Sequence, residues 1–205
     1  MEALTLSSPM VIVVVGPPGS GKSFFADQFA KTFGAALVSE DKIRWTLFAN
    51  HTYSDNENVM VAQVADLIIT ELFHTNKTFV LDGGYNTKSA RDALNTHAKK
   101  AGFRVLTIVV QTDEPAARRR ALKRDPKKHE DQYKQSLTLD EFTRQCKLYQ
   151  PPAVNQDAVV ISGKHTYQAQ ARVVLKKMVE TQGTRPAAPA TRPAPTVRSR
   201  GPFIQ

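Results

Sequence analysis

One short segment constrains this chain more than any other, and it directly follows an apolar run near the N-terminus. It fits the pattern of glycine, any four residues, glycine, lysine, then serine or threonine, and its residues are Gly16-Pro17-Pro18-Gly19-Ser20-Gly21-Lys22-Ser23. Glycines let the loop turn its backbone N–H groups inward, and the following helix aims its positive end at the same point. Lys22 would reach the β- and γ-phosphates of a nucleotide, and the Ser23 hydroxyl would bind Mg²⁺. The segment therefore predicts a site for ATP.

Strand-like and helix-like segments alternate along the chain. Five apolar, β-prone runs predict strands, and they are Met10–Val15, Ala35–Val38, Thr78–Asp82, Phe103–Gln111 and Ala158–Ile161. Seven segments between or after them predict helices, and they are Lys22–Phe33, Asp41–Phe48, Glu57–His74, Thr87–Ala101, Glu114–Arg124, Leu139–Leu148 and Tyr167–Glu180. This alternation predicts an α/β fold with a five-stranded parallel sheet and helices on both faces.

A second acidic group for the metal is expected at the end of the third strand. Asp82 closes the apolar run from Thr78, and no other predicted strand ends in an acid. Folds of this type place a Mg²⁺-holding aspartate at the carboxyl end of a buried strand, where it acts directly or through water. The structural alternative is a turn-forming aspartate before Gly83 and Gly84.

Candidate groups for activating an acceptor follow the second strand. Asp41 and Arg44 are three residues apart and would share a helical face beside the phosphate loop. The carboxylate could take a proton from an attacking hydroxyl, and the arginine could hold a phosphate or carboxylate of the substrate. Glu40 is the competing base, and a solvated helix start with an ion pair is the structural alternative.

A basic segment after the fourth strand predicts a lid. Arg120 and Arg124 are four residues apart, so they would lie on one helical face, and the polar stretch to Ser136 would be its flexible part. Arginines on a lid over residues 114–136 could stabilise the charge that develops on a transferred phosphoryl group. A solvated basic helix face is the alternative.

Together these features resemble the P-loop kinases of the polynucleotide 5′-hydroxyl kinase type, in an AAA-type ATP-binding group with zeta-toxin-like kinases as relatives. The resemblance covers about residues 10–180 and rests on the phosphate loop, Asp41-x-x-Arg44, Leu81-Asp82 followed by Asn86, and Arg120-x-x-x-Arg124. It implies that Asp41 is the general base and that Arg44 contacts the acceptor's phosphate. It further implies that Arg120 and Arg124 are lid residues. It also implies a sheet order of 2-3-1-4-5. The Gly83-Gly84-Tyr85 segment departs from the family's usual pattern.

The charge divides between a domain and a tail. The formal net charge is +9, of which residues 183–205 carry +4 as four arginines without an acid, leaving +5 on residues 1–182. We expect residues 1–182 to form the kinase domain and the Pro- and Arg-rich residues 183–205 to be a disordered tail. The tail would either increase solubility or make electrostatic contact with nucleic acid or another acidic surface.

Other features bear on location. The longest apolar run is Met10–Val15, which is far shorter than the ~20 residues of a membrane-spanning helix. One cysteine, Cys146, cannot form an internal disulfide, and together with the lack of a secretory signal this favours the reducing cytoplasm. The five histidines have no metal-ligand spacing.

The sequence thus predicts an ATP- and Mg²⁺-dependent kinase that phosphorylates a hydroxyl. A nucleic-acid 5′-hydroxyl or nucleotide-like acceptor is favoured, and a sugar or other small metabolite is second. A P-loop protein that binds ATP as a non-catalytic switch is the competing class. Asp41-x-x-Arg44 and the lid arginines favour the enzyme, because a simple switch needs neither. The oligomeric state stays open.

Overall fold

The computed structural model describes residues 9–182, except for residues 126, 129–130 and 154–156. The predicted kinase domain is therefore seen over most of its length. The tail predicted at residues 183–205 lies outside the described residues. Within the described part of the chain, no helix has the length and apolar character needed to cross a membrane.

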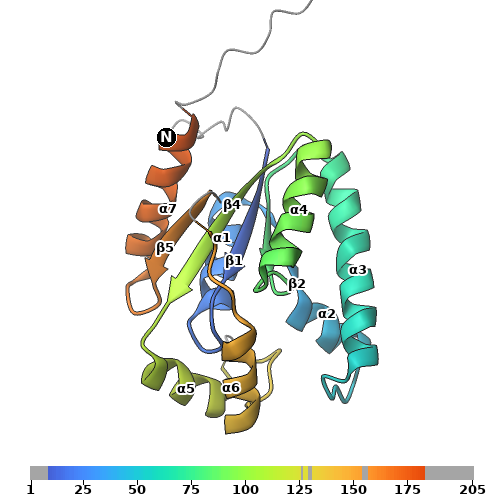
Figure 1. The fold of residues 1–205 in the computed structure, drawn as a ribbon, viewed down its shortest axis with the longest axis vertical. Helices are drawn as coiled ribbons and strands as arrows, with labels where there is room; N and C mark the ends of the chain where they lie inside the picture. The colour runs from blue at the N-terminus through green and yellow to red at the C-terminus, as the bar shows by residue number, and fades with distance from the viewer. Residues whose placement is uncertain (1–8, 126, 129–130, 154–156, 183–205) are drawn as a thin grey trace, which may run out of the picture.

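One five-stranded sheet, all of it parallel, forms the centre of the fold (Figure 1). Its strands are β1 (Met10–Val15), β2 (Ala36–Ser39), β3 (Phe79–Asp82), β4 (Arg104–Gln111) and β5 (Ala158–Ser162). They lie in the order β2-β3-β1-β4-β5, which confirms both the predicted α/β class and the order implied by the family resemblance. In the register, Ser39 lies opposite Asp82 and Asp82 lies opposite Val14, so three strand ends meet beside the phosphate loop.

Seven helices are found in the described residues. They are α1 (Lys22–Phe33), α2 (Glu40–Leu47), α3 (Asp55–His74), α4 (Lys88–Lys100), α5 (Glu114–Leu122), α6 (Leu139–Leu148) and α7 (Tyr167–Gln182). Two predicted caps are present: Gly34 follows the C-terminus of α1 in the left-handed conformation, and at the N-terminus of α4 the Thr87 hydroxyl accepts a hydrogen bond from the N–H of Ala90.

The helices cover both faces of the sheet, as predicted. Alternate residues of β1 point to opposite faces, because side chains alternate along a strand. Ile12 and Val14 pack with α1 and α7, whereas Val11 and Val13 pack with α3 and α4. Helices α5 and α6 pack on each other in a smaller cluster beyond the carboxyl end of β4 (Figure 1). The candidate site therefore lies at the carboxyl edge, between the sheet and this smaller cluster.

One predicted boundary is wrong in a way that affects the site. The helix expected to run to Arg124 ends at Leu122. There the chain turns to meet a later segment: the N–H of Arg124 donates to the Ser136 hydroxyl, and the N–H of Leu137 donates to the Ala121 carbonyl. Arg124 thus lies beyond α5, and the helical face that it was expected to share with Arg120 does not extend to it.

Candidate active site

The phosphate loop connects β1 to α1 with the backbone that its glycines were expected to allow. Gly16, Gly19 and Gly21 all have positive φ angles, of 144°, 73° and 103°. Gly21 precedes α1 and has no side chain to cap it, so the first N–H groups of the helix are left for another acceptor. Such a helix start favours an anion, and the Lys22 ammonium lies over the loop, donating to the Pro17 carbonyl at 2.8 Å.

The electrostatics around Lys22 also favour an anion. Burial lowers the pKa of Lys22 to about 8, and the positive charge of Lys134 contributes in the same direction. The carboxylates of Asp82 and Asp41 act in the opposite direction and offset part of the effect. A desolvated ammonium close to a second one is stabilised when a negatively charged group arrives. The loop is thus suited to hold phosphate.

The residues predicted to hold Mg²⁺ provide suitable oxygen donors. Asp82 is buried at the end of β3, and the Ser39 hydroxyl lies 3.4 Å from one of its carboxylate oxygens. Ser23 and Asp82 line the same cavity of about 130 Å³. Hydroxyl and carboxylate oxygens are ligands that Mg²⁺ accepts, with phosphates and water completing its shell. No group of three or more His, Cys, Asp or Glu side chains suited to a metal occurs among the described residues.

A lysine side chain contacts one of these oxygen donors, the Ser23 hydroxyl. The Lys134 ammonium donates to the Ser23 hydroxyl, and it lies 3.4 Å from an Asp41 carboxylate oxygen. The position therefore already attracts positive charge, which is consistent with a metal-binding role for Ser23. Sequence reasoning missed Lys134, because the residue lies in a polar loop without periodicity or motif.

The two adjacent acids at the start of α2 lie in different surroundings. Asp41 lines the 130 Å³ cavity with Ser23 and Asp82, as a base beside the phosphate loop would. Glu40 lies against the backbone of Gly83 and Gly84, where a Cβ atom added to Gly84 would be 2.4 Å from a Glu40 carboxylate oxygen. Burial, followed by repulsion from Asp41, raises the pKa of Glu40 to about 7. The glycine pair makes room for Glu40, and the role of Asp41 as the base stays a prediction.

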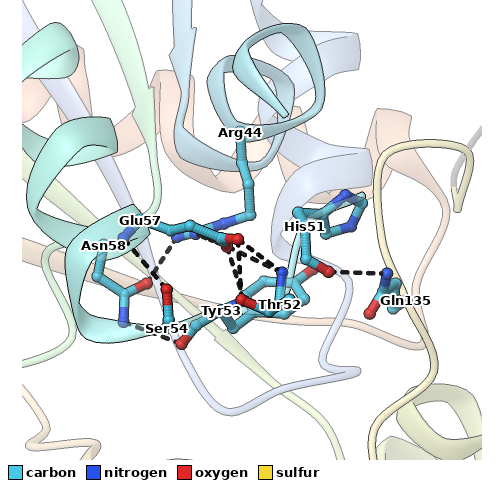
Figure 2. A network of polar contacts seen from close by, with 8 residues as sticks. All are labelled: Arg44, His51, Thr52, Tyr53, Ser54, Glu57, Asn58 and Gln135. Carbon is cyan, nitrogen blue, oxygen red and sulfur yellow. Dashed lines mark hydrogen bonds and ion pairs between the residues drawn. The ribbon is translucent and has the colours of Figure 1, made fainter. Parts of the chain in front are cut away.

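Arg44 is paired with residues of α3. Its guanidinium is buried, 3.2 Å from a Glu57 carboxylate oxygen and 2.7 Å from the Asn58 side-chain oxygen, and it lies over the Tyr53 ring (Figure 2). The structural alternative for this segment was an ion pair between Asp41 and Arg44, but Arg44 pairs with Glu57 and Asp41 pairs with Lys134.

Glu57 is the centre of this network, which we call the Glu57 network and which comprises Arg44, Thr52, Tyr53, Glu57 and Asn58. Its carboxylate accepts hydrogen bonds from the Thr52 N–H and hydroxyl and from the Tyr53 N–H (Figure 2). Burial would raise the pKa of Glu57, but these bonds and Arg44 hold it below its ordinary value. The network fixes the loop between α2 and α3. The role of Arg44 as an acceptor contact stays a prediction, and it would require the Glu57 pair to open.

The predicted lid arginines bond to backbone carbonyls. Arg120 donates to the Gly163 carbonyl at 3.3 Å, and Arg124 donates to the Gln135 carbonyl at 2.7 Å. Gly163 packs on the phosphate loop so closely that an added Cβ would lie 2.0 Å from the Ser20 carbonyl oxygen. Arg120 is thus next to the loop, whereas Arg124 connects the chain after α5 to Gln135 within the predicted lid. Their catalytic roles stay predictions.

Asn86 gains a structural role that the sequence did not define. Its side-chain oxygen accepts a hydrogen bond from the Gly16 N–H at 3.1 Å, so it holds the first residue of the phosphate loop. The family resemblance singled it out, through Leu81-Asp82 followed by Asn86.

Comparisons with known proteins bear on the fold and the family of the chain. No curated protein sequence matches the chain. Among solved structures, a candidate kinase from Chloroflexus aurantiacus is 12% identical, with a TM-score of 0.67 over 83% of this chain and 99% of that one. Kti12 from Chaetomium thermophilum, in complex with ADP-AlF3, is 21% identical, with a TM-score of 0.63 over 83% and 97%. A sugar kinase from Janibacter sp. is 13% identical, with a TM-score of 0.60 over 83% and 95%.

At these identities, the structural similarities establish the fold alone, which is that of the P-loop kinases. A family model described as AAA domain matches residues 11–152. The match includes the phosphate loop, the two acids at the start of α2, Asp82 and the lid. Since it covers more than half of the chain, the protein belongs to this AAA domain family of P-loop kinase-like proteins.

Proposed function

We propose that the protein is an ATP- and Mg²⁺-dependent kinase that transfers the γ-phosphoryl group to a hydroxyl of a second molecule. The observation that carries this proposal is the 130 Å³ cavity in which Asp41 meets Ser23 and Asp82. It brings a carboxylate outside the phosphate loop to the place where the γ-phosphate of a bound nucleotide would lie. A protein that only binds nucleotide has no need of that carboxylate.

Each residue of the site has a distinct task in this reaction. Lys22 and the N-terminus of α1 would neutralise the β- and γ-phosphates, and Ser23 and Asp82 would hold the metal. Asp41 would accept the proton of the attacking hydroxyl. Bound Mg²⁺ would supply positive charge that offsets the charge developing on the phosphoryl oxygens. Asn86 would keep Gly16, and with it the loop, in place.

For the acceptor, we propose a small hydroxyl-bearing metabolite such as a sugar. The preference for a nucleic-acid 5′-hydroxyl depended on Arg44 as an anchor for the acceptor's phosphate, and this arginine is held in the Glu57 network. Similarity to a sugar kinase and to a gluconokinase from Sinorhizobium meliloti supports the small acceptor. The single cysteine supports a cytoplasmic location.

A nucleic-acid acceptor remains the second candidate because of two features of the chain. The Trp45 side chain is 51% exposed beside the site, and the chain carries a net charge of +9. An exposed indole can stack on a base, and a positive chain attracts a polyanion.

The test is transfer of γ-labelled phosphate from ATP to a panel of sugars, amino sugars, nucleosides and 5′-hydroxyl oligonucleotides. We expect label in a small acceptor with the wild-type protein and none with Lys22→Ala. Label confined to oligonucleotides would select the second candidate. Tight ATP binding without transfer to any member of the panel would favour the switch and contradict the proposal.

A further inference from the structure

Lys134 lies in the predicted lid and reaches into the candidate site. Its ammonium contacts both the Ser23 hydroxyl and the Asp41 carboxylate, and its side chain is only 18% exposed. A lysine in a loop ordinarily extends into water, because its charged end is strongly hydrated. The position of the Lys134 ammonium between Ser23 and Asp41, largely withdrawn from water, therefore calls for an explanation.

The neighbours of Lys134 fix its position. The Tyr133 ring packs edge-on against Trp45 with 6.1 Å between ring centres, and the Lys42 ammonium lies 5.6 Å from the centre of the Tyr133 ring. On the other side, the Gln135 side chain donates to the His51 carbonyl at 3.2 Å (Figure 2). The lid is thus docked on α2 and on the loop that follows it. With both neighbours anchored, residue 134 is directed into the site.

The present contacts of Lys134 are incompatible with a filled metal site. A Mg²⁺ ion bound to the Ser23 hydroxyl would repel an ammonium that donates to the same oxygen. Lys134 also repels Lys22, which approaches the same region from the phosphate loop. An anion between the two ammonium groups would convert this repulsion into two attractions.

We propose that Lys134 binds the γ-phosphate of ATP from the lid, opposite Lys22. On nucleotide binding, its ammonium leaves Ser23 for a γ-phosphate oxygen. This also releases Asp41 from its ion pair, so that the carboxylate can accept the acceptor's proton. Arg120 and Arg124 bond to carbonyl groups of Gly163 and Gln135, whereas the Lys134 ammonium contacts Ser23 and Asp41 directly. The inference rests on the proposed ATP site, but it does not depend on the identity of the acceptor.

The test compares binding of a non-hydrolysable ATP analogue and of ADP, by calorimetry in the presence of Mg²⁺. Lys134→Met should weaken the analogue about ten- to hundredfold, as expected for a lost charge-assisted hydrogen bond. ADP, which has no γ-phosphate, should change by no more than about twofold. Lys134→Arg should retain part of the affinity for the analogue. Lys127→Met, an exposed lysine of the same lid, is the matched control and should change neither.

The other outcomes overturn the proposal in distinct ways. Equal weakening of both nucleotides would mean that Lys134 only organises the lid. Tighter binding of both would mean that its ammonium merely competes with the metal, and unchanged binding would mean that it has no part in nucleotide recognition. A wild-type protein that binds neither nucleotide would refute the ATP site itself. Thermal unfolding of each variant shows whether the fold is intact.

Discussion

Replacement of Gly19 by alanine should damage both the fold and the nucleotide site. Gly19 has a φ of +73°, and a Cβ atom placed there would lie 2.0 Å from the Ala117 carbonyl oxygen. Ordinary carbon–oxygen contacts lie at roughly 3.3–3.6 Å, so the loop and α5 would have to separate by more than about 1 Å. Gly34 is the matched control, because its φ is +61° and its added Cβ would have no neighbour within 4 Å.

The two variants share one energetic cost and differ in the other. A left-handed backbone costs an alanine about 1–2 kcal/mol at either position. Overpacking adds about 1–3 kcal/mol at Gly19 alone, so that variant should lose about 2–5 kcal/mol. For a domain of this size, each kcal/mol lowers Tm by about 2–4 °C. Displacement of the phosphate loop should also weaken ATP binding at least about tenfold, since the loop's N–H groups must converge on phosphate.

Thermal unfolding and calorimetric titration with ATP measure the two effects. Gly34→Ala should lower Tm modestly and leave ATP affinity unchanged, whereas Gly19→Ala should lower both. If the two variants were alike in Tm and in ATP affinity, the close packing of α5 on the phosphate loop would not matter, and this reasoning would be refuted.

Three further predictions concern the acids and the arginine of α2. In steady-state kinetics, Asp41→Asn should reduce kcat by about 10²–10⁴-fold with ATP affinity nearly unchanged. If Glu40→Gln loses kcat instead, Glu40 and not Asp41 is the base. The fold raises the pKa of Glu40 to about 7, so the folded state holds the proton of this carboxyl more tightly than the unfolded state does. The stability that this proton contributes is lost as pH rises from the ordinary pKa of a glutamate through 7. Glu40→Gln should therefore be more stable than wild type at pH 8 by roughly 1–3 kcal/mol, with the difference vanishing near pH 4 in chemical denaturation. Arg44→Ala should lower Tm because the Glu57 network loses its cation, and Arg44→Lys should not return Tm to the wild-type value. An unchanged Tm with a raised KM for the acceptor would instead identify Arg44 as an acceptor contact.

The phosphate loop and the sheet were predictable because their signals are local. Glycine spacing determines where a backbone can turn toward phosphate, and a run such as Met10–Val15 can be buried only as a central strand. Asp82 followed from the same logic, since a polar residue that ends a buried strand lies at the functional edge.

The remaining features depend on contacts between distant segments. Helical spacing placed Arg44 on one face with Asp41, as an acceptor contact or as an ion-pair partner, but the buried carboxylate of Glu57, thirteen residues along, holds the arginine. Helix α5 was expected to continue to Arg124, but hydrogen bonds with residues 136 and 137 end it at Leu122. Lys134 could not be selected from sequence, because only the docking of its neighbours on α2 directs it to Ser23.

The central claim is that Asp41 activates a hydroxyl for attack on ATP bound at the phosphate loop. It is tested most directly by a single-turnover experiment with ATP labelled at the γ-phosphate, in the presence of a small acceptor identified from the panel. Wild-type protein should move the label to the acceptor, and Asp41→Asn should bind ATP equally well but transfer the label at least about a hundredfold more slowly. Transfer at the wild-type rate by Asp41→Asn, or label released only as inorganic phosphate by the wild type, would contradict the claim.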